Sequence, residues 1–344
     1  MLILLVDWKK HGLNFLEKEF SDLHIPFKTF DIPDYSMLDI TKKFRLFNLY
    51  FKYFKLAWKA VKHSNPRDVI ICVNFTTAIA VGYACRLLHR NRKIIGLNMI
   101  AHKRSRYIEW FRRIVFRPVM SMPSFIITVN SEQYIGEYST RFKVSKSKFS
   151  VLHDPSQTLS QEQTTSVENT YVFSGGEAKR DWETLFNSSH RLPSIKFVCI
   201  ARKKYFDKSL EIPPNVELLF DTDSVTFYSY MKAASIIVIP LKSLSPAGLI
   251  VLLDASSMYK PVIVTKTPST ENYIIDGFSG YLSEPENVNE LTEKIRHLWD
   301  DSELQRRFSS NLNKSVQENH SPHYYANQLL SILSDNNLYS QLQN

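Results

Sequence analysis

The stretch "LKSLSPAGLIVLLDASSMYKPVIVTKTPSTENYIIDGFSGYL", residues 241–282, decides the fold. Its apolar run from 248 to 253 ends in a single carboxylate, Asp254, and a second β-branched run, "PVIVTK" (261–266), begins at a proline. Continuous Leu, Ile and Val without polar alternation is typical of elements covered on both sides. The stretch therefore predicts a helix carrying one acid, followed by a buried parallel strand.

The same alternation of apolar runs and amphipathic segments extends along the chain in both directions. In the first half we predict strands at 2–8, 68–75, 93–100 and 124–130, with helices at 11–23 and 77–90. In the second half we predict strands at 170–176, 195–201, 216–220, 235–241 and 261–266, with helices at 181–190, 226–234 and 248–258. This order predicts two α/β domains with parallel, doubly wound sheets, which bind ligands at the carboxyl ends of their strands.

The domain boundaries follow from length and composition. A chain of 344 residues exceeds what one core usually serves. The polar stretch "SQTLSQEQTTSVEN" (156–169) is predicted to be a linker. We expect an N-terminal domain at 1–155, a C-terminal domain at 170–320, and a helix within 321–344 that packs back on the N-terminal domain.

Charge and cysteine usage limit the location and the partners. Residues 1–155 hold 26 Lys and Arg against 12 Asp and Glu, whereas the remainder holds 17 against 22, so the first half is expected to face an anion. The cysteines Cys72, Cys85 and Cys199 lie far apart in apolar runs and predict reduced core thiols, which favours a cytoplasmic protein. No apolar run reaches the roughly 18 residues that span a bilayer.

Two cationic segments follow neighbouring predicted strands of the second domain. The first strand ends in Gly175 and Gly176, ahead of Lys179 and Arg180, and the next ends in "ARKKY" (201–205). Glycine lets backbone approach a phosphate, and the following helix contributes its positive N-terminal end. A glycine pair after a strand is also an ordinary turn, but two adjacent cationic edges favour a pyrophosphate site.

The order of these segments resembles the donor-binding domain of bacterial family 4-like glycosyltransferases, the glycosyl transferases group 1, which have the GT-B fold. The resemblance rests on GG-x3-RDW (175–182), "IPPNVELL" (212–219), "IIVIPL" (236–241), the opening stretch and "LTEKIRHLWDDSELQRRF" (291–308), and it covers about residues 170–320. The N-terminal half is similar only in outline, through its strand rhythm and residues 125–155. The resemblance implies two Rossmann-like domains facing across a cleft.

The resemblance also implies a donor site for a nucleotide-sugar. An acid at the position of Asp254 would accept hydrogen bonds from the ribose hydroxyls, and the preceding loop would approach the phosphates and the sugar with its backbone. The implied donor-binding residues are Gly175, Gly176, Arg180, Arg202, Lys203, Ala247, Gly248, Leu249, Asp254 and Glu271.

This chain departs from the family pattern at one acid. The usual pair is Glu, seven residues, Glu, and here the first position is Pro246. Alternatively, Asp254 caps a helix or lies on its surface, and Glu271 is a surface acid. The family implies a retaining hexosyltransferase that needs no cofactor and no metal, although "DTD" (221–223) imitates a metal-binding pair of acids.

The acceptor is expected in the N-terminal half. His102 follows the strand at 93–100 and would polarise or position hydroxyl groups, or else lie on the surface. Aromatic residues recur every three or four positions from Phe44 to Trp58 among cations and without any acid, and the segment 102–118 repeats the mixture. Such a stripe packs on a core or lies on an anionic membrane. The membrane or acceptor candidates are Lys52, Lys55, Trp58, Lys59, Trp110, Arg112 and Arg113.

The sequence thus favours a metal-independent glycosyltransferase, peripheral on the inner face of the cell membrane. It would add a sugar from a nucleotide-sugar to a lipid-linked or saccharide acceptor during assembly of a cell-surface polysaccharide such as lipopolysaccharide or capsule. A noncatalytic GT-B relative and a sugar-nucleotide epimerase are alternatives. We expect no nucleic-acid partner, because the basic segments accompany no recognisable reader motif.

Overall fold

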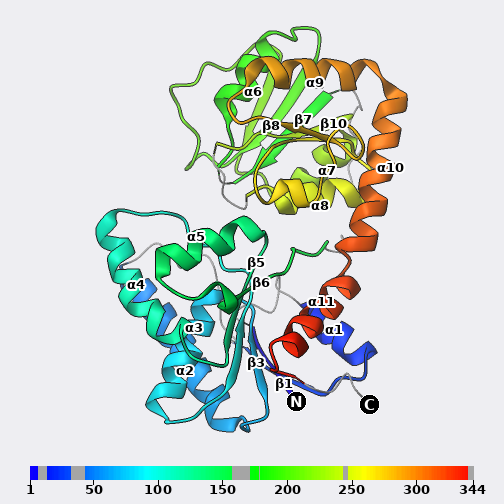
Figure 1. Ribbon diagram of the computed structural model, residues 1–344. Helices are drawn as coiled ribbons and strands as arrows, with labels where there is room; N and C mark the ends of the chain where they lie inside the picture. The colour runs from blue at the N-terminus through cyan, green and yellow to red at the C-terminus, as the bar shows by residue number, and fades with distance from the viewer. Residues whose placement is uncertain (7–13, 32–42, 157–170, 178, 243–246, 340–344) are drawn as a thin grey trace. The chain divides into compact units, whose positions relative to one another are not determined.

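The computed structural model describes residues 1–6, 14–31, 43–156, 171–177, 179–242 and 247–339 (Figure 1). The chain divides into two units. Unit 1 comprises Met1–Asp154 and Pro322–Asn344, and unit 2 comprises Pro155–Ser321. All of the predicted linker except Ser156 lies outside the described residues.

The described strands of unit 1 form one parallel sheet in the order β2-β1-β3-β4-β5-β6. The strands are β1 (Leu2–Val6), β2 (Phe27–Asp31), β3 (Val69–Cys72), β4 (Lys93–Gly96), β5 (Phe125–Val129) and β6 (Phe149–Val151). In β1, alternate residues enter two different cores, since Ile3 and Leu5 face one and Leu2 and Leu4 face the other. The uninterrupted apolar strands are therefore explained by helices on both faces of the sheet.

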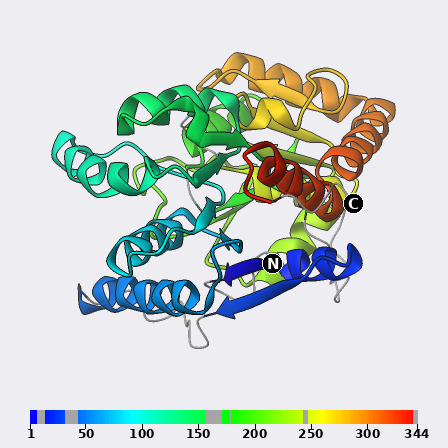
Figure 2. The same ribbon diagram turned by 60° about the horizontal axis from the view of Figure 1, so that its bottom comes forward.

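The helices of unit 1 divide between these faces (Figures 1 and 2). One face is covered by α2 (Lys43–His63), α3 (Phe75–Leu87), α4 (Arg106–Met120) and α5 (Glu132–Phe142). The other face is covered by α1 (Asn14–Asp22) and α11 (Pro322–Asp335). In this second layer Phe15 of α1 meets the ring of Tyr325 of α11 edge-on at 5.5 Å. The C-terminal helix is thus part of the core of unit 1.

Unit 2 repeats the architecture with a parallel sheet in the order β12-β11-β10-β7-β8-β9. Its strands are β7 (Tyr171–Gly176), β8 (Lys196–Ala201), β9 (Val216–Phe220), β10 (Ile236–Ile239), β11 (Val262–Thr265) and β12 (Tyr281–Ser283). One face carries α7 (Ser224–Ala233) and α8 (Leu249–Ser257), and the other carries α6 (Trp182–His190) and α9 (Val288–Asp300). Helix α10 (Ser302–Asn319) contributes to both cores.

The predicted α/β class with two doubly wound parallel sheets is confirmed, and every predicted strand and helix is present, most of them with shifted ends. Strands β2, β6 and β12 were missed. The β2 strand is at the sheet edge with mostly half-exposed residues, while β6 and β12 have three residues each, so none of them forms a long apolar run.

The docking of α11 predicts a measurable contribution to the stability of unit 1. Leu329 is fully buried against the sheet, so Leu329→Ala should lower the free energy of unfolding by about 2–5 kcal/mol through lost burial and a residual cavity. Chemical denaturation followed by circular dichroism measures the change. The exposed neighbour Gln328→Ala is the control, expected within about 0.5 kcal/mol of the parent, and equal effects of both changes would contradict the packing.

Candidate functional site

The carboxyl edge of the unit 2 sheet gathers the predicted donor-binding segments. The neighbouring strands β11, β10, β7 and β8 are parallel, so their carboxyl ends meet at one edge. Gly175 and Gly176 end β7, Arg202 follows β8, Gly248 follows β10 and Glu271 follows β11. The structure therefore brings to one edge residues that are up to about 100 positions apart in the chain.

The glycine turn after β7 is shaped around the side chain of Arg180. Gly176 has a φ angle of 142°, and a Cβ at this position would collide with the Arg180 guanidinium. The turn is also tied to the end of β10, because the Asp181 N–H donates to Pro240 O over 3.0 Å and the Lys242 N–H donates to Lys179 O over 2.9 Å. Only glycine at position 176 lets the guanidinium lie against the end of the strand.

Arg180 is a buried cation without a carboxylate to balance it in the described part of the chain. Its side chain is buried, and its Nε donates to Gly175 O over 2.9 Å. Burial lowers the pKa of Arg180 to about 10, so the group still carries its charge at neutral pH. A buried charge destabilises a fold unless it is paired, which makes this position suited to an anionic ligand.

The other charged side chains predicted at the ends of these strands are half-buried in the case of Arg202 and exposed in the cases of Lys203 and Glu271, and two of the three are ion-paired. Arg202 binds Glu177, with Nη2 at 2.7 Å from Oε1. Glu271, in a short 3-10 helix (Thr270–Asn272), lies 3.7 Å from the Lys266 ammonium. Lys203 is exposed, and its backbone N–H donates to Asp221 Oδ1 over 3.3 Å. Arg180 therefore differs from these residues in being both buried and free of an acidic partner among the described residues.

Helix α8 begins at the same edge. Gly248 caps the helix with a φ angle of 84°, and a Cβ there would lie 2.9 Å from Ile239 Cγ2. No side chain caps the first backbone N–H groups of α8 within the described residues. Ala247 is half-buried and Leu249 is buried, so backbone rather than side chains is what these positions offer to a ligand.

Asp254 lies in the second turn of α8 and is buried. Its Oδ2 accepts a hydrogen bond of 3.1 Å from the Tyr228 hydroxyl of α7. Burial raises the pKa of Asp254 to about 6, against the opposing effect of the Tyr228 hydrogen bond. Tyr228 was missed, since it lies 26 residues before Asp254 and no spacing connects the two.

The acids of "DTD" have local roles in the structure. The Asp223 carboxylate caps α7, accepting from Thr226 N at 2.8 Å and from Thr226 Oγ1 at 3.1 Å. Asp221 accepts from the Lys203 backbone. Helix capping and loop closure therefore account for both acids.

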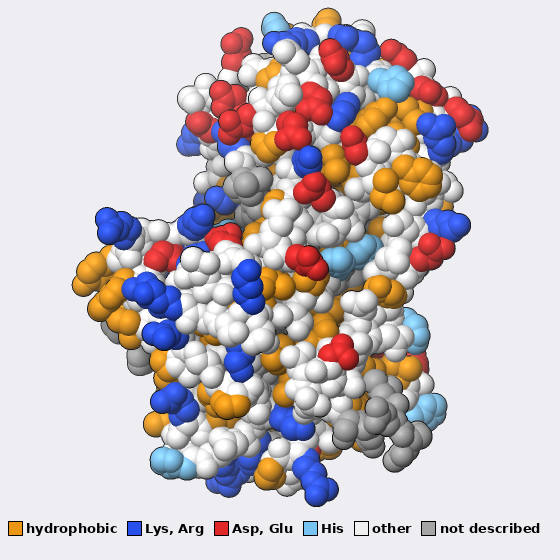
Figure 3. Space-filling view, in the orientation of Figure 1, with side chains coloured by type: hydrophobic (Ala, Val, Ile, Leu, Met, Phe, Trp, Pro, Cys, Tyr) orange, Lys and Arg blue, Asp and Glu red, His pale blue; other side chains and the backbone are white. Residues whose placement is uncertain are grey.

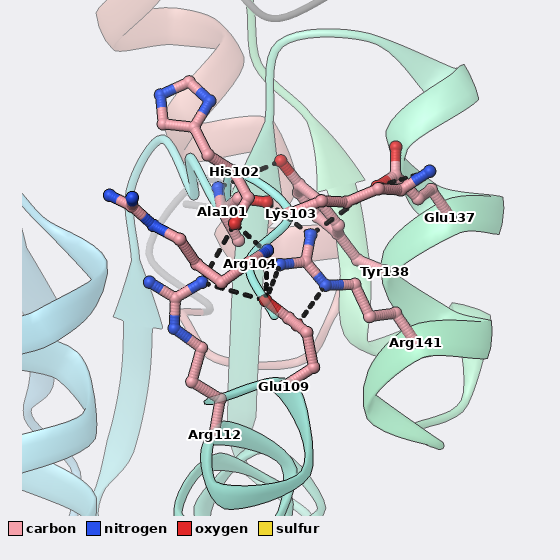
Figure 4. A network of polar contacts seen from close by, with 9 residues as sticks. All are labelled: Ala101, His102, Lys103, Arg104, Glu109, Arg112, Glu137, Tyr138 and Arg141. Atoms are coloured by element: carbon pink, nitrogen blue, oxygen red, sulfur yellow. Dashed lines mark hydrogen bonds and ion pairs between the residues drawn. The ribbon is translucent and has the colours of Figure 1, made fainter. Parts of the chain in front are cut away.

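In unit 1, His102 lies in the loop that follows β4, and side chains of α4 and α5 hold the backbone of this loop (Figure 4). The carbonyl of His102 accepts 2.9 Å hydrogen bonds from both Arg112 and Arg141. The Ala101 carbonyl accepts from Arg141, and the Ala101 N–H donates to the Tyr138 hydroxyl over 3.1 Å. The imidazole is exposed and points away from these contacts.

Glu109, Arg112 and Arg141 together form a clamp on this loop, and Glu109 is at its centre. Its carboxylate accepts from Arg141 Nε at 2.6 Å, from Arg141 Nη2 at 2.7 Å and from the Arg104 backbone N–H at 3.0 Å. Burial acts to raise the pKa of Glu109, but the hydrogen bonds and charge of Arg141, aided by Arg104 and Arg112, lower it below its usual value. Neither Glu109 nor Arg141 was singled out in the sequence, because nothing in the segments 102–118 and 125–155 that contain them marks the two as partners.

The two basic-aromatic segments differ in the structure. On α2, Phe51, Trp58, Lys52, Lys55 and Lys59 are exposed, whereas the side chains of residues 43–48 lie outside the described part. On α4, Trp110 is exposed and Arg113 is half-buried, while Arg112 is engaged with Glu109 and the His102 carbonyl. Within the described ranges, no helix is long and apolar enough to cross a membrane.

Comparison with protein families places a match in the second unit. Residues 200–315 match the family model described as glycosyl transferases group 1. An uncharacterized glycosyltransferase of Methanocaldococcus jannaschii is 33% identical over 97 residues, which are 28% of this chain and 27% of that protein. The match thus spans about a quarter of the length of this curated relative.

Solved structures with the same fold cover almost the whole chain. The Anabaena protein HepE, in complex with UDP and glucose, aligns over 97% of this chain and 99% of its own at 14% identity, with a TM-score of 0.68. The sucrose-phosphate synthase of Thermosynechococcus elongatus aligns over 97% and 98% at 15% identity, with a TM-score of 0.70. A glycosyltransferase of Rickettsia africae aligns over 98% and 99% at 13% identity, with a TM-score of 0.69.

The buried Asp254 predicts a pH-dependent effect of Asp254→Asn. The folded pKa of about 6 exceeds the ordinary 3.8, so the folded protein is destabilised as pH rises through this window, by about 3 kcal/mol once above it. Asparagine removes the charge and keeps an oxygen for Tyr228. The variant should therefore be more stable than the parent at pH 8 and lose that advantage near pH 4. Urea denaturation at both pH values checks this, and an advantage independent of pH would contradict it.

Proposed function

We propose that the chain is a retaining hexosyltransferase of the glycosyl transferases group 1 with the GT-B fold, because residues 200–315 match that family model and almost the whole chain shares its fold with solved glycosyltransferases. It moves a sugar from a nucleotide-sugar donor to a lipid-linked or saccharide acceptor. The product would enter a cell-surface polysaccharide such as lipopolysaccharide or capsule. The HepE complexes, which contain UDP, glucose or UDP-glucose, support a nucleotide-sugar as the donor.

The observation that carries the proposal is the buried Arg180 at the glycine turn. Its guanidinium lies at the carboxyl edge of the parallel sheet and has no acidic partner among the described residues. Helix α8 begins at the same edge. A diphosphate satisfies both features, because guanidinium and helix N–H groups each donate to phosphate oxygens. Gly176 leaves room for the guanidinium of Arg180, and the half-buried Arg202 and the exposed Lys203 add positive charge at the same edge.

The chemistry assigned to this site is charge stabilisation. When the bond between the sugar and the diphosphate breaks, negative charge grows on the leaving phosphate, where Arg180 and the N-terminus of α8 stabilise it. Asp254 holds Tyr228 with one oxygen and accepts from the ribose with the other. Ala247, Gly248 and Leu249 present backbone to the sugar, and Glu271 contacts the ribose or the sugar.

Unit 1 would supply the acceptor side. The clamp of Glu109 and Arg141 fixes the backbone beside His102, so that the exposed imidazole can orient an acceptor or donor hydroxyl. The excess of cations in residues 1–155 suits an anionic lipid surface, and we assign the protein to the cytoplasmic face of the membrane.

Nucleotide titration of an Arg180 variant tests the donor site. Arg180→Met removes an uncompensated buried charge together with its one hydrogen bond to a backbone carbonyl, so the free energy of unfolding should fall by no more than about 1 kcal/mol. Affinity for the diphosphate should fall about 10- to 100-fold, because hydrogen bonds to charged groups are lost. Calorimetry with UDP, GDP and ADP measures it, after a thermal-shift screen in which a ligand at 100 times its dissociation constant adds about 2.7 kcal/mol.

A matched control separates this effect from a general loss of charge. Lys196→Met removes an exposed cation at the opposite end of β8, where Lys196 pairs with Glu217 at 2.9 Å. It should leave nucleotide affinity unchanged. Parental affinity in Arg180→Met would exclude the diphosphate site. Nucleotide binding with neither transfer nor hydrolysis would favour the noncatalytic relative, and acceptor-independent conversion of the donor sugar would favour the epimerase.

Metal independence is a second test of the same site. Because Arg180 and the α8 N-terminus supply the positive charge, EDTA should leave the transfer rate unchanged. Transfer is measured as release of the nucleoside diphosphate, with and without chelator. A strict requirement for Mn²⁺ or Mg²⁺ would show that protein charges do not suffice and would overturn this assignment.

A further inference from the structure

Helix α4 carries an exposed apolar face. The side chains of Tyr107, Trp110 and Phe111 are 79%, 50% and 60% exposed, and Ile114 is exposed as well. These residues recur at steps of three and four, which places them on one side of the helix. Figure 3 shows the corresponding hydrophobic patch over α4 at the left edge of the molecule, bordered by blue Lys and Arg side chains. A contiguous apolar patch of this kind marks an interaction surface.

The opposite side and the C-terminal half of α4 are held firmly in unit 1. Val119 and Met120 are buried, and the ring of Phe116 meets that of Phe75 edge-on at 5.2 Å. The hydroxyl of Tyr83 donates to Val115 O over 2.7 Å. The exposed aromatic face is therefore part of a rigid element, and its orientation is set by the core.

The charge around the patch has one sign. Between residues 103 and 117 the one acid is Glu109, and its carboxylate is turned inward to Arg141 and Arg112. Arg104, Arg106, Arg113 and Arg117 have no acidic partner among the described residues. The patch thus combines outward aromatic rings with unbalanced cations, the combination that binds an anionic lipid interface.

We propose that the α4 face, defined as Tyr107, Trp110, Phe111 and Ile114 with the arginines around them, docks on an anionic bilayer. The rings enter the headgroup region, and the arginines bind lipid phosphates. A second copy is a poor occupant, because a two-fold contact would set the same cationic patch against itself. The choice of a lipid-linked acceptor rests on the proposed function, but docking itself does not.

The structure favours α4 over α2 as the docking element, although both segments were predicted from the sequence as membrane candidates. On α2, Phe54 is half-buried and packs against Trp58 at 5.9 Å, and Lys59 lies 5.8 Å from the ring of Phe30. Part of the α2 stripe is therefore used within unit 1. The exposed aromatics Tyr50 and Phe51, also on α2, offer a matched control pair.

Docking through α4 would also place the His102 loop at the bilayer. Glu109 is adjacent to Trp110 in the helix and holds the Arg104 N–H, while Arg112 and Arg141 hold the His102 carbonyl. These contacts connect the first turns of α4, which carry the exposed aromatic rings, to the backbone of the His102 loop. A saccharide attached to a membrane lipid would then meet the imidazole at the height of the headgroups.

Vesicle sedimentation of the full chain without nucleotide tests the proposal. The parent should bind vesicles of phosphatidylcholine mixed with phosphatidylglycerol and bind pure phosphatidylcholine more weakly. Trp110→Ser with Phe111→Ser should lower the partition coefficient about tenfold or more, because two apolar side chains no longer enter the interface. Tyr50→Ser with Phe51→Ser should leave it nearly unchanged. Arg106→Glu with Arg113→Glu should abolish the preference for the anionic lipid.

Measurements of folding and of nucleotide binding distinguish a loss of docking from other defects of the variants. Thermal unfolding and UDP calorimetry accompany every variant, so a failure of the donor site is seen separately from a failure of docking. The proposal is overturned if the parent ignores anionic vesicles, if the α4 pair binds as the parent does, or if the α2 pair alone loses binding. It is also overturned if light scattering finds a dimer that the α4 pair disrupts while no form binds lipid.

Discussion

The parallel pairing of β7 with both β8 and β10 is the constraint on which the donor site depends. Each pairing aligns a strand end with its neighbour, so that the turns after the strands lie side by side. The backbone bonds between residues 179–181 and 240–242 then join the glycine turn to the loop that leads into α8. Without this register, Arg180 and the N-terminus of α8 would be unrelated segments of chain. Sheet topology, rather than any local motif, creates the positive edge.

Burial gives the two central charged groups their character. Burial disfavours the charged form of both groups, since it lowers the pKa of Arg180 to about 10 and raises the pKa of Asp254 to about 6. Neither group is paired with an opposite charge among the described residues. A fold selected for stability alone would replace such groups with apolar ones. Their presence in neighbouring elements at one sheet edge is the physical reason to assign a ligand to this edge, since a ligand can supply the missing partners.

Strands and turns whose pattern lies within one segment could be predicted from the sequence, whereas contacts between side chains of distant segments could not. Long apolar runs identified the buried strands, and a glycine pair before a cationic helix start identified the turn around Arg180. The edge strand β2 escaped because its residues are mostly half-exposed, and its pattern lacks an uninterrupted apolar run. Tyr228 beside Asp254, and Arg141 beside Glu109, escaped because they are separated by 26 and 32 residues, and only the packing of helices makes them partners.

Glu109 shows how one side chain can give a helix two surfaces with different tasks. Were its carboxylate turned outward, it would offset the surrounding arginines and weaken attraction to an anionic surface. Bound inward by Arg141 and Arg112, it leaves the exterior of α4 cationic and at the same time fixes the backbone from Ala101 to Arg104. The lowered pKa of Glu109 keeps it ionised under acidic conditions in which an ordinary carboxyl group would begin to protonate. The clamp therefore persists to a lower pH than it would with an ordinary carboxyl group, and it keeps the surface of α4 joined to the loop of His102.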